Sequence, residues 1–166
     1  MDRKEAPMAL IIEDALPGDI PSCAQIACDS EIGRRYGFVQ ESLTARMQER
    51  LIGGDVILVA RETELAIPEI AGFAWIDLKG GFGQSPYLKL IAANPARRSN
   101  GVGSHLLAAF EARTLGRGRA WLLLCSDFNT KAIRFYENHG YAVVGALPDF
   151  AKDGITEMVL YKLQGH

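Results

Sequence analysis

The segment from Asn94 to Ser104 holds residue types that suit phosphate binding. Two adjacent arginines, Arg97 and Arg98, precede two glycines, Gly101 and Gly103. Glycine lets a backbone approach an anion closely, and the first turn of a helix carries free N–H groups with a partial positive charge. Because a strand pattern runs into this segment and a helical pattern leaves it, we predict a pyrophosphate site built from backbone amides.

Two other phosphate-binding motifs do not fit the segment. The chain has no G-x-x-x-x-G-K-S/T sequence, which argues against nucleoside-triphosphate hydrolysis. Leu106 stands where a dinucleotide-binding fingerprint has its third glycine, and the segment lies past the middle of the chain. A dinucleotide-binding protein is therefore the weaker hypothesis.

The elements that must position this segment alternate between strand and helix patterns. We predict strands at 9–14, 55–61, 69–77, 87–92, 120–125, 141–144 and 157–162, helices at 19–30, 39–51, 101–115 and 131–139, and a flexible loop at 80–86. A strand–helix–strand run implies a parallel pair with a right-handed crossover, and hairpin-like closing strands make the sheet mixed. The predicted class is α/β, a mixed twisted β-sheet of about six to seven strands flanked by about four helices.

Composition and charge limit the classes of partner. The 166 residues, 48% hydrophobic and 23% charged, fit one domain over 1–166. The net charge of −2 argues against a broad nucleic-acid surface, and no run approaches the roughly 20 apolar residues of a membrane span. Three cysteines without a C-x-x-C pair favour neither a disulfide framework nor a zinc site, so we expect a cytoplasmic protein without a metal.

Two signatures resemble those of the GNAT superfamily of N-acetyltransferases. Arg98-x-x-Gly101-x-Gly103 matches the family pattern Q/R-x-x-G-x-G/A, and 129–141 is similar to N-x-x-A-x-x-x-Y-x-x-x-G-F/Y. The resemblance covers the whole chain in element order and is sharp over 87–141, the expected cofactor-binding core. It implies a transferase that moves the acetyl group of acetyl-coenzyme A to a primary amine of a small molecule or peptide, by direct attack in a ternary complex.

The resemblance also implies how the cofactor is held. The pyrophosphate would lie on backbone amides of Arg98, Ser99, Asn100, Gly101, Val102, Gly103 and Ser104, with charge added by Arg97 and Arg98. The edge of Leu90, Ile91 and Ala92 would pair with the amides of the pantetheine arm, as in strand addition.

The residues of the second signature have two readings each. Asn129 would hydrogen-bond the pantetheine arm, cap the following helix, or do both. Lys131 or Arg134 would reach the 3′-phosphate, or would simply be solvated. Tyr136 is the candidate general acid for the departing thiolate, or else an aromatic core contact. The resemblance favours the catalytic function for Tyr136 and a place in the core for the adjacent Phe135.

A general base does not follow from the sequence. Many members of the family carry a Glu on the fourth strand, whereas 87–92 has no carboxylate, and the remaining candidates are Asp77, Asp127, Asp149 and Glu31. The missing carboxylate motivates an alternative function, a non-catalytic acyl-coenzyme A-binding sensor or scaffold. The sequence leaves the acceptor and the oligomeric state open, a homodimer included.

Overall fold

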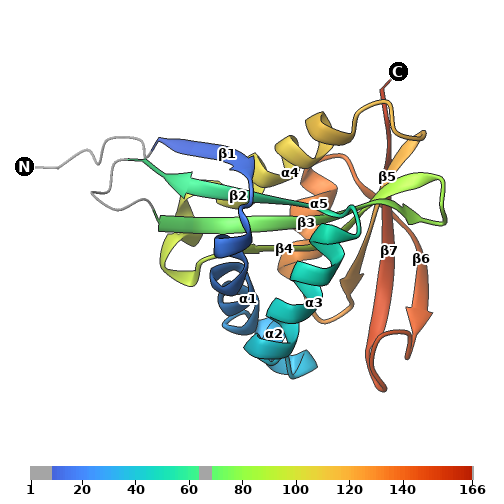
Figure 1. Ribbon diagram of the computed structural model, residues 1–166. Coiled ribbons are helices and arrows are strands. Elements are labelled where there is room, and N and C mark those ends of the chain that lie inside the picture. The colour runs from blue at the N-terminus through green and yellow to red at the C-terminus, as the bar shows by residue number, and fades with distance from the viewer. Residues whose placement is uncertain (1–8, 64–68, 166) are drawn as a thin grey trace, which may run out of the picture. The chain divides into compact units, whose positions relative to one another are not determined.

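The computed structural model describes residues 9–63 and 69–165, and for 98–100 the backbone alone (Figure 1). The described chain forms, in order, β1 (Leu10–Asp14), the 3-10 helix η1 (Pro17–Asp19), α1 (Ile20–Cys28), α2 (Glu31–Tyr36), α3 (Gln40–Ile52), β2 (Val56–Glu62), β3 (Glu69–Gly81), β4 (Ser85–Ala93), the 3-10 helix η2 (Pro95–Asn100), α4 (Val102–Thr114), β5 (Ala120–Ser126), α5 (Thr130–Asn138), β6 (Ala142–Pro148) and β7 (Thr156–Leu163). The strands form a mixed sheet with the order β1-β2-β3-β4-β5-β7-β6, which confirms the predicted α/β class.

The chain divides into two compact units. The first consists of the described parts of Met1–Gly53, Ile57–Ala74 and Ile91–Ala109, and the second of those of Gly54–Val56, Trp75–Leu90 and Phe110–His166. One domain over 1–166 stays a prediction. Within the described residues, no helix has the length and apolar character that crossing a membrane requires.

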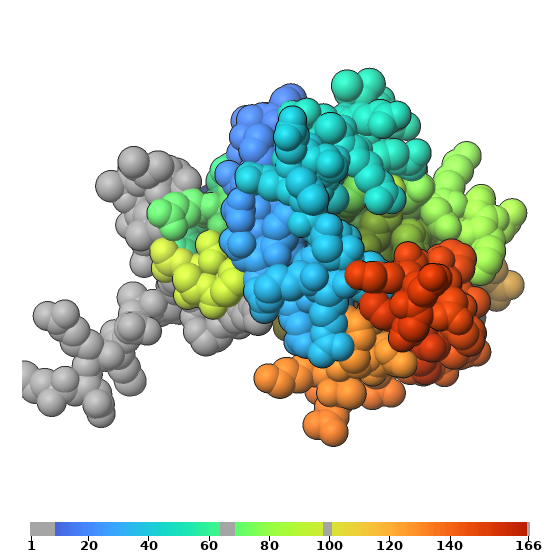
Figure 2. Space-filling view, turned by 90° about the horizontal axis from the view of Figure 1, so that it is seen from below, coloured from blue at the N-terminus to red at the C-terminus, as the bar shows by residue number. Residues whose placement is uncertain are grey.

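The first unit packs three helices together. α1 contacts α2 and α3, and Figure 2 shows these three helices, in blue to cyan, on one face. α1 buries Cys23 and Ala27, and α3 buries Met47. β1 pairs antiparallel with β2, from Leu10 opposite Glu62 onward. The sequence missed α2, because six residues are too few to show a helical period.

The second unit contains the parallel pair of β4 and β5 and the closing hairpin. β4 and β5 are parallel, as predicted, while β7 is antiparallel to both β5 and β6. The alternation along β5 buries Trp121, Leu123 and Cys125. The opposite face of β5 is half-buried from Ala120 to Leu124.

The predicted flexible loop at 80–86 is wrong in extent. β3 continues to Gly81 and β4 begins at Ser85, so a three-residue turn joins them. The turn closes by a hydrogen bond of 2.8 Å from the Gly83 N–H to the Lys79 carbonyl. The glycine-rich composition is typical of a turn, but it does not show how far the two strands extend into it.

Candidate functional site

In the first unit, the segment predicted to bind phosphate is a tight turn that leads into α4. The Asn94 side chain accepts a hydrogen bond of 3.1 Å from the Ala96 N–H and so caps η2. Gly101 follows with φ +69° and ψ +17°, in the left-handed region that favours glycine. α4 then begins at Val102, so the free N–H groups of its first turn come directly after a reversal of the backbone.

A second glycine, which the sequence analysis did not single out, holds the start of α4 against the end of β4. A Cβ on Gly72 would lie 2.7 Å from the Val102 Cγ1 and 2.7 Å from the Ala92 carbonyl oxygen. Both distances are too short for a side chain, and Val102 itself is fully buried. Gly72 therefore allows the close approach that fixes where the turn sits.

Arg97 is bound to carboxylates of its own unit. Its Nη1 lies 3.1 Å from the Glu62 Oε2, and its Nη2 lies 3.4 Å from the Glu69 Oε2. Glu62 is buried and needs this charge, so Arg97 anchors the turn to β2 and β3. A direct contact of Arg97 with a cofactor stays a prediction.

In the second unit, β4 and β5 pair over a short stretch. Among the described residues their register contains two pairs, Tyr87 with Leu122 and Leu88 with Leu123. The following residues of both strands, Leu90 on β4 among them, lie beyond the last pair and are unpaired with each other. Leu90 is half-buried, and so are Ile91 and Ala92 in the first unit.

The second signature begins with a helix cap. Asn129 precedes α5, and its Oδ1 accepts a hydrogen bond of 3.3 Å from the Ala132 N–H. The capping alternative is therefore present in the structure. The side-chain Nδ2 keeps two hydrogens to donate, so a bond to a cofactor arm is compatible with the cap. Lys131 and Arg134 are exposed on α5.

Of the two adjacent aromatic residues of α5, Tyr136 is buried and Phe135 is only half-buried. Tyr136 is 6% exposed and lies edge-on to Tyr141, with ring centroids 5.8 Å apart. Phe135 is only half-buried, so the expectation that Phe135 is the core residue is wrong. Burial raises the pKa of Tyr136, and the ionisable groups of Cys125 and Tyr87 raise it further, so the hydroxyl keeps its proton at neutral pH.

Comparison with known proteins identifies the family. The model of the acetyltransferase (GNAT) family matches residues 25–141, most of the chain. The chain belongs to the GNAT acetyltransferase family. No curated protein matches the sequence.

Solved structures share the fold of this GNAT protein at low identity. Ard1 from Thermoplasma volcanium is 21% identical, with a TM-score of 0.77 over 95% of this chain and 99% of that chain. Ribosomal-protein-alanine N-acetyltransferase from Brucella melitensis is 18% identical, with a TM-score of 0.74 over 92% and 99%. An aminoglycoside 6′-N-acetyltransferase complexed with coenzyme A is 17% identical, with a TM-score of 0.74 over 94% and 98%. At these identities the likeness concerns the fold.

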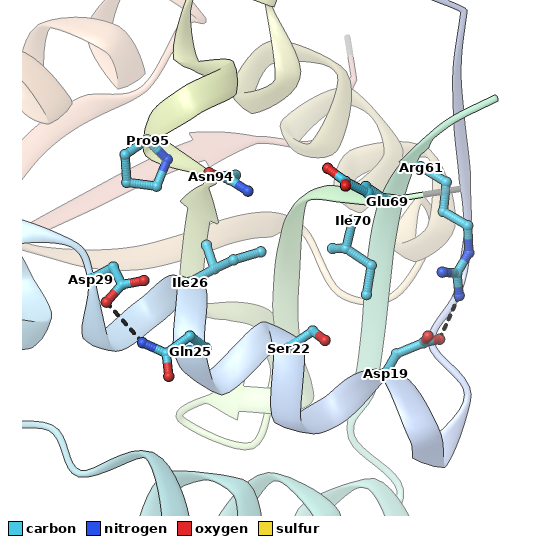
Figure 3. A pocket seen from close by; sticks show the side chains of 10 residues that line it. All are labelled: Asp19, Ser22, Gln25, Ile26, Asp29, Arg61, Glu69, Ile70, Asn94 and Pro95. Carbon is cyan, nitrogen blue, oxygen red and sulfur yellow. Dashed lines mark hydrogen bonds and ion pairs between the residues drawn. The ribbon is translucent and has the colours of Figure 1, made fainter. Parts of the chain in front are cut away.

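A pocket of about 420 Å³ lies in the first unit (Figure 3). It is lined by Asp19, Ser22, Gln25, Ile26, Asp29, Arg61, Glu69, Ile70, Asn94 and Pro95. The Arg61 Nη2 donates to the Asp19 Oδ2 at 2.6 Å, and the Gln25 Nε2 donates to the Asp29 Oδ1 at 2.8 Å. Three carboxylates against one arginine make this pocket unsuitable for a pyrophosphate.

The four carboxylates that the sequence offered as general bases are exposed or half-buried. Asp127 and Asp149 are exposed on the second unit, and Glu31 is exposed on the first. Asp77 is half-buried, and its Oδ1 accepts a backbone hydrogen bond of 3.0 Å.

Two buried carboxylates in the second unit escaped the sequence analysis. The Asp55 Oδ2 accepts hydrogen bonds from the Trp75 Nε1 at 2.7 Å and from the Lys89 Nζ at 3.1 Å. Glu157 on β7 is 5% exposed. Its signal in the sequence is a charged residue at the start of the strand pattern, which is weak because edge and surface strands show the same feature.

The cysteines and the residue types that commonly bind metals are distributed as follows. All three cysteines are free. Burial raises the pKa of Cys23 to about 12 and that of Cys125 to about 11, so both stay thiols at neutral pH. Among the residues that the structure describes, no group of three or more His, Cys, Asp or Glu side chains could hold a metal ion.

Proposed function

We propose that the chain is an acyl-coenzyme A-dependent N-acetyltransferase that uses acetyl-coenzyme A and acts on a primary amine of a small molecule or peptide. The observation that carries the proposal is the left-handed turn at Gly101, which opens directly into the free amides of α4 in a chain of the GNAT family. The three free cysteines suit a reducing cytoplasm, where we expect the protein to work.

In this proposal the residues of the two family signatures and of β4 hold the cofactor. The pyrophosphate binds the backbone amides of 98–104, and the unpaired edge formed by Leu90, Ile91 and Ala92 binds the pantetheine arm. Asn129 donates to the same arm through Nδ2, and Lys131 contacts the 3′-phosphate. Support comes from the coenzyme A complex of the aminoglycoside 6′-N-acetyltransferase, which shares the fold.

Tyr136 protonates the thiolate that leaves when the tetrahedral intermediate collapses. Its raised pKa keeps the proton on the hydroxyl at neutral pH. A weaker acid also transfers its proton less readily, so the step depends on the positive charge of the nitrogen that has just attacked. This function for Tyr136 separates the catalytic proposal from the alternative of a non-catalytic sensor or scaffold.

Relatives with amine acceptors support the acceptor class. The names of two structures that share the fold specify N-acetylation, one of an aminoglycoside and one of a ribosomal-protein alanine. We therefore expect an amine acceptor here as well, and the structure favours neither of these two kinds over the other.

One experiment tests the cofactor and the chemistry together. The protein is incubated with acetyl-coenzyme A and a pooled amine library, and native mass spectrometry follows cofactor binding while product analysis follows a gain of one acetyl group. Binding with acetyl transfer supports the enzyme. Binding without thioester loss across the library supports the scaffold, and binding of NAD without coenzyme A supports the dinucleotide hypothesis.

A further inference from the structure

Ser126 and Glu157 form a buried pair at the end of β5. They are opposite one another in the antiparallel register of β5 and β7, which are neighbours in the sheet (Figure 1). The Ser126 Oγ lies 3.2 Å from the Glu157 Oε1 and 3.4 Å from its Oε2. Ser126 is 4% exposed and Glu157 is 5% exposed. A carboxylate is costly to bury, and a neutral hydroxyl compensates only part of that cost.

The pair lies on the face of β5 opposite to α5. The Trp121 Nε1 donates to the Thr114 Oγ1 of α4 at 2.9 Å, and the Cys125 Sγ lies 4.0 Å from the carbonyl oxygen of Asn129, which precedes α5. Trp121 and Cys125 therefore face α4 and α5. Successive residues of a strand point to opposite faces, so Ser126 points away from these helices. Glu157 is on the same side, since directly paired residues share a face.

The pair also lies beyond the place where β4 and β5 stop pairing. The last pair of that parallel register is Leu88 with Leu123, three residues before Ser126. Past this point the register contains no further pair of β4 and β5 among the described residues. A reacting group that enters between the two strands would have Tyr136 on the α5 side and Glu157 on the other.

The charges around the two buried carboxylates favour Glu157 over Asp55 as a base. The Lys89 ammonium and the Trp75 indole both donate to Asp55, and such donors stabilise the charged form and weaken its basicity. Burial raises the pKa of Glu157, and a carboxylate with a raised pKa is a stronger base.

The titratable groups on β5, β6 and β7 divide between the two faces of the sheet. β6 carries none between Ala142 and Pro148, and on β5 Cys125 faces the helices. On β7 itself, Tyr161 shares the face of Glu157, whereas Lys162 lies on the other face, where its Nζ is 2.8 Å from the Glu111 Oε2.

We propose that Glu157 is the general base that accepts a proton from the ammonium group of the acceptor, on the face of β5 opposite to Tyr136. The proposal rests on the N-acetyltransferase function proposed above. An ammonium group has no lone pair, so it must lose a proton before it can attack a thioester. The base must therefore stand where the acceptor arrives, and the acid where the sulfur leaves.

The protons and bonds balance in this scheme. Glu157 takes one proton from the ammonium group, and the free amine forms the N–C bond to the acetyl carbon. The C–S bond then breaks, and the thiolate takes the proton of Tyr136, which recovers one from the attacking nitrogen. The products are the acetamide and the coenzyme A thiol, and Glu157 releases its proton to solvent.

The test compares the pH profiles of the wild type and Glu157→Gln. The probes are acetyl-coenzyme A with an aminoglycoside and with a peptide that begins with alanine, and product amide is quantified by mass spectrometry. We expect kcat/KM of Glu157→Gln to be about 10² to 10³ lower than that of the wild type at pH 7. The deficit should shrink toward pH 10, because the free amine fraction rises about tenfold per pH unit below the amine pKa.

Two further variants complete the design. Glu111→Gln removes another carboxylate of the same unit, on the opposite face, and should keep the wild-type pH profile. Glu157→Asp keeps a carboxylate and should restore the shape of the wild-type profile at a lower rate, which tests the proposal even where Glu157→Gln folds poorly.

The outcomes separate the base from the function. If kcat/KM of Glu157→Gln is lower than that of the wild type by a constant factor from pH 6 to pH 10, or equals it, Glu157 is not the general base. Amide formation by the wild type in the same experiment still supports the transferase function. A wild type that binds acetyl-coenzyme A and forms no amide with any acceptor overturns the proposed function itself.

Discussion

The Arg97 Nη1 lies 3.1 Å from the Glu62 Oε2, and this ion pair ties the turn before Gly101 to the last residue of β2. The Glu62 side chain is 3% exposed. Removing the arginine would leave a buried carboxylate without its counter-charge, which is far costlier than losing a surface pair.

We therefore expect Arg97→Ala to lower the free energy of unfolding by about 3 kcal/mol. Urea denaturation at constant m-value measures the change. Arg134→Ala, which removes an exposed arginine from α5, serves as the control and should change stability by less than about 0.5 kcal/mol. Adding Glu62→Gln to Arg97→Ala should recover part of the loss. Equal stability of Arg97→Ala and Arg134→Ala would show that the ion pair of Arg97 with Glu62 contributes little.

Gly101→Asp should abolish binding of acetyl-coenzyme A while the protein stays folded. The variant places a side chain and a negative charge where the phosphates are proposed to bind, at a φ of +69° that favours glycine. A thermal-shift assay measures the stabilisation by acetyl-coenzyme A. At a ligand concentration about 100 times Kd, the free energy of unfolding of the wild type should rise by about 2.7 kcal/mol. Gly116→Asp is the matched control, since Gly116 has φ +81° and open space around its Cβ position, and it should bind normally. Normal cofactor affinity in Gly101→Asp would make the turn purely structural.

Tyr136→Phe should lower kcat by about 10² to 10⁴ and leave cofactor affinity close to that of the wild type. The ring remains, so its edge-on contact with Tyr141 is kept and only the proton donor is lost. Steady-state kinetics with the acceptor found in the library experiment, together with cofactor titration, separates the two effects. Wild-type turnover in this variant would show that water or another group protonates the thiolate.

The free energy of unfolding should fall steeply as the pH rises above about 10. Burial raises the pKa of Tyr87 to about 12 and raises those of Tyr136 and Tyr141 as well. A phenol whose pKa is higher in the folded state binds more protons there above pH 10, so unfolding becomes easier as pH rises through the window between about 10 and the folded-state value.

Each such group adds about 1.4 kcal/mol per pH unit to that loss. Urea denaturation measured from pH 8 to pH 11 gives the change in the free energy of unfolding per pH unit. In Tyr136→Phe this slope should be smaller by the contribution of one phenol. An unchanged slope in Tyr136→Phe would mean that this phenol ionises as easily in the folded protein as in the unfolded chain.

The sequence by itself determined the features that depend on neighbouring residues. The run from Asn94 to Ser104 predicted a turn before a helix, since the cap at Asn94, the left-handed glycine and the helical period all act within a few residues. The mixed α/β class followed in the same way from the alternation of strand and helix patterns. The clearest error of the sequence prediction is the extent of the loop at 80–86, which concerns only where the flanking strands end and begin.

Only the tertiary structure decided which side chains are buried and what they contact. Helical phase placed Phe135 and Tyr136 about 100° apart, but which of them is buried depends on what packs against α5. The contact between Ser126 and Glu157 joins residues 31 positions apart, and their types and spacing predict no such pairing. Arg97 is a further case: its charge was read as available to a phosphate, whereas folding brings Glu62 and Glu69 to it. Burial and pairing of charges arise from long-range packing, so they change the acidity and availability of groups in ways that a local pattern does not contain.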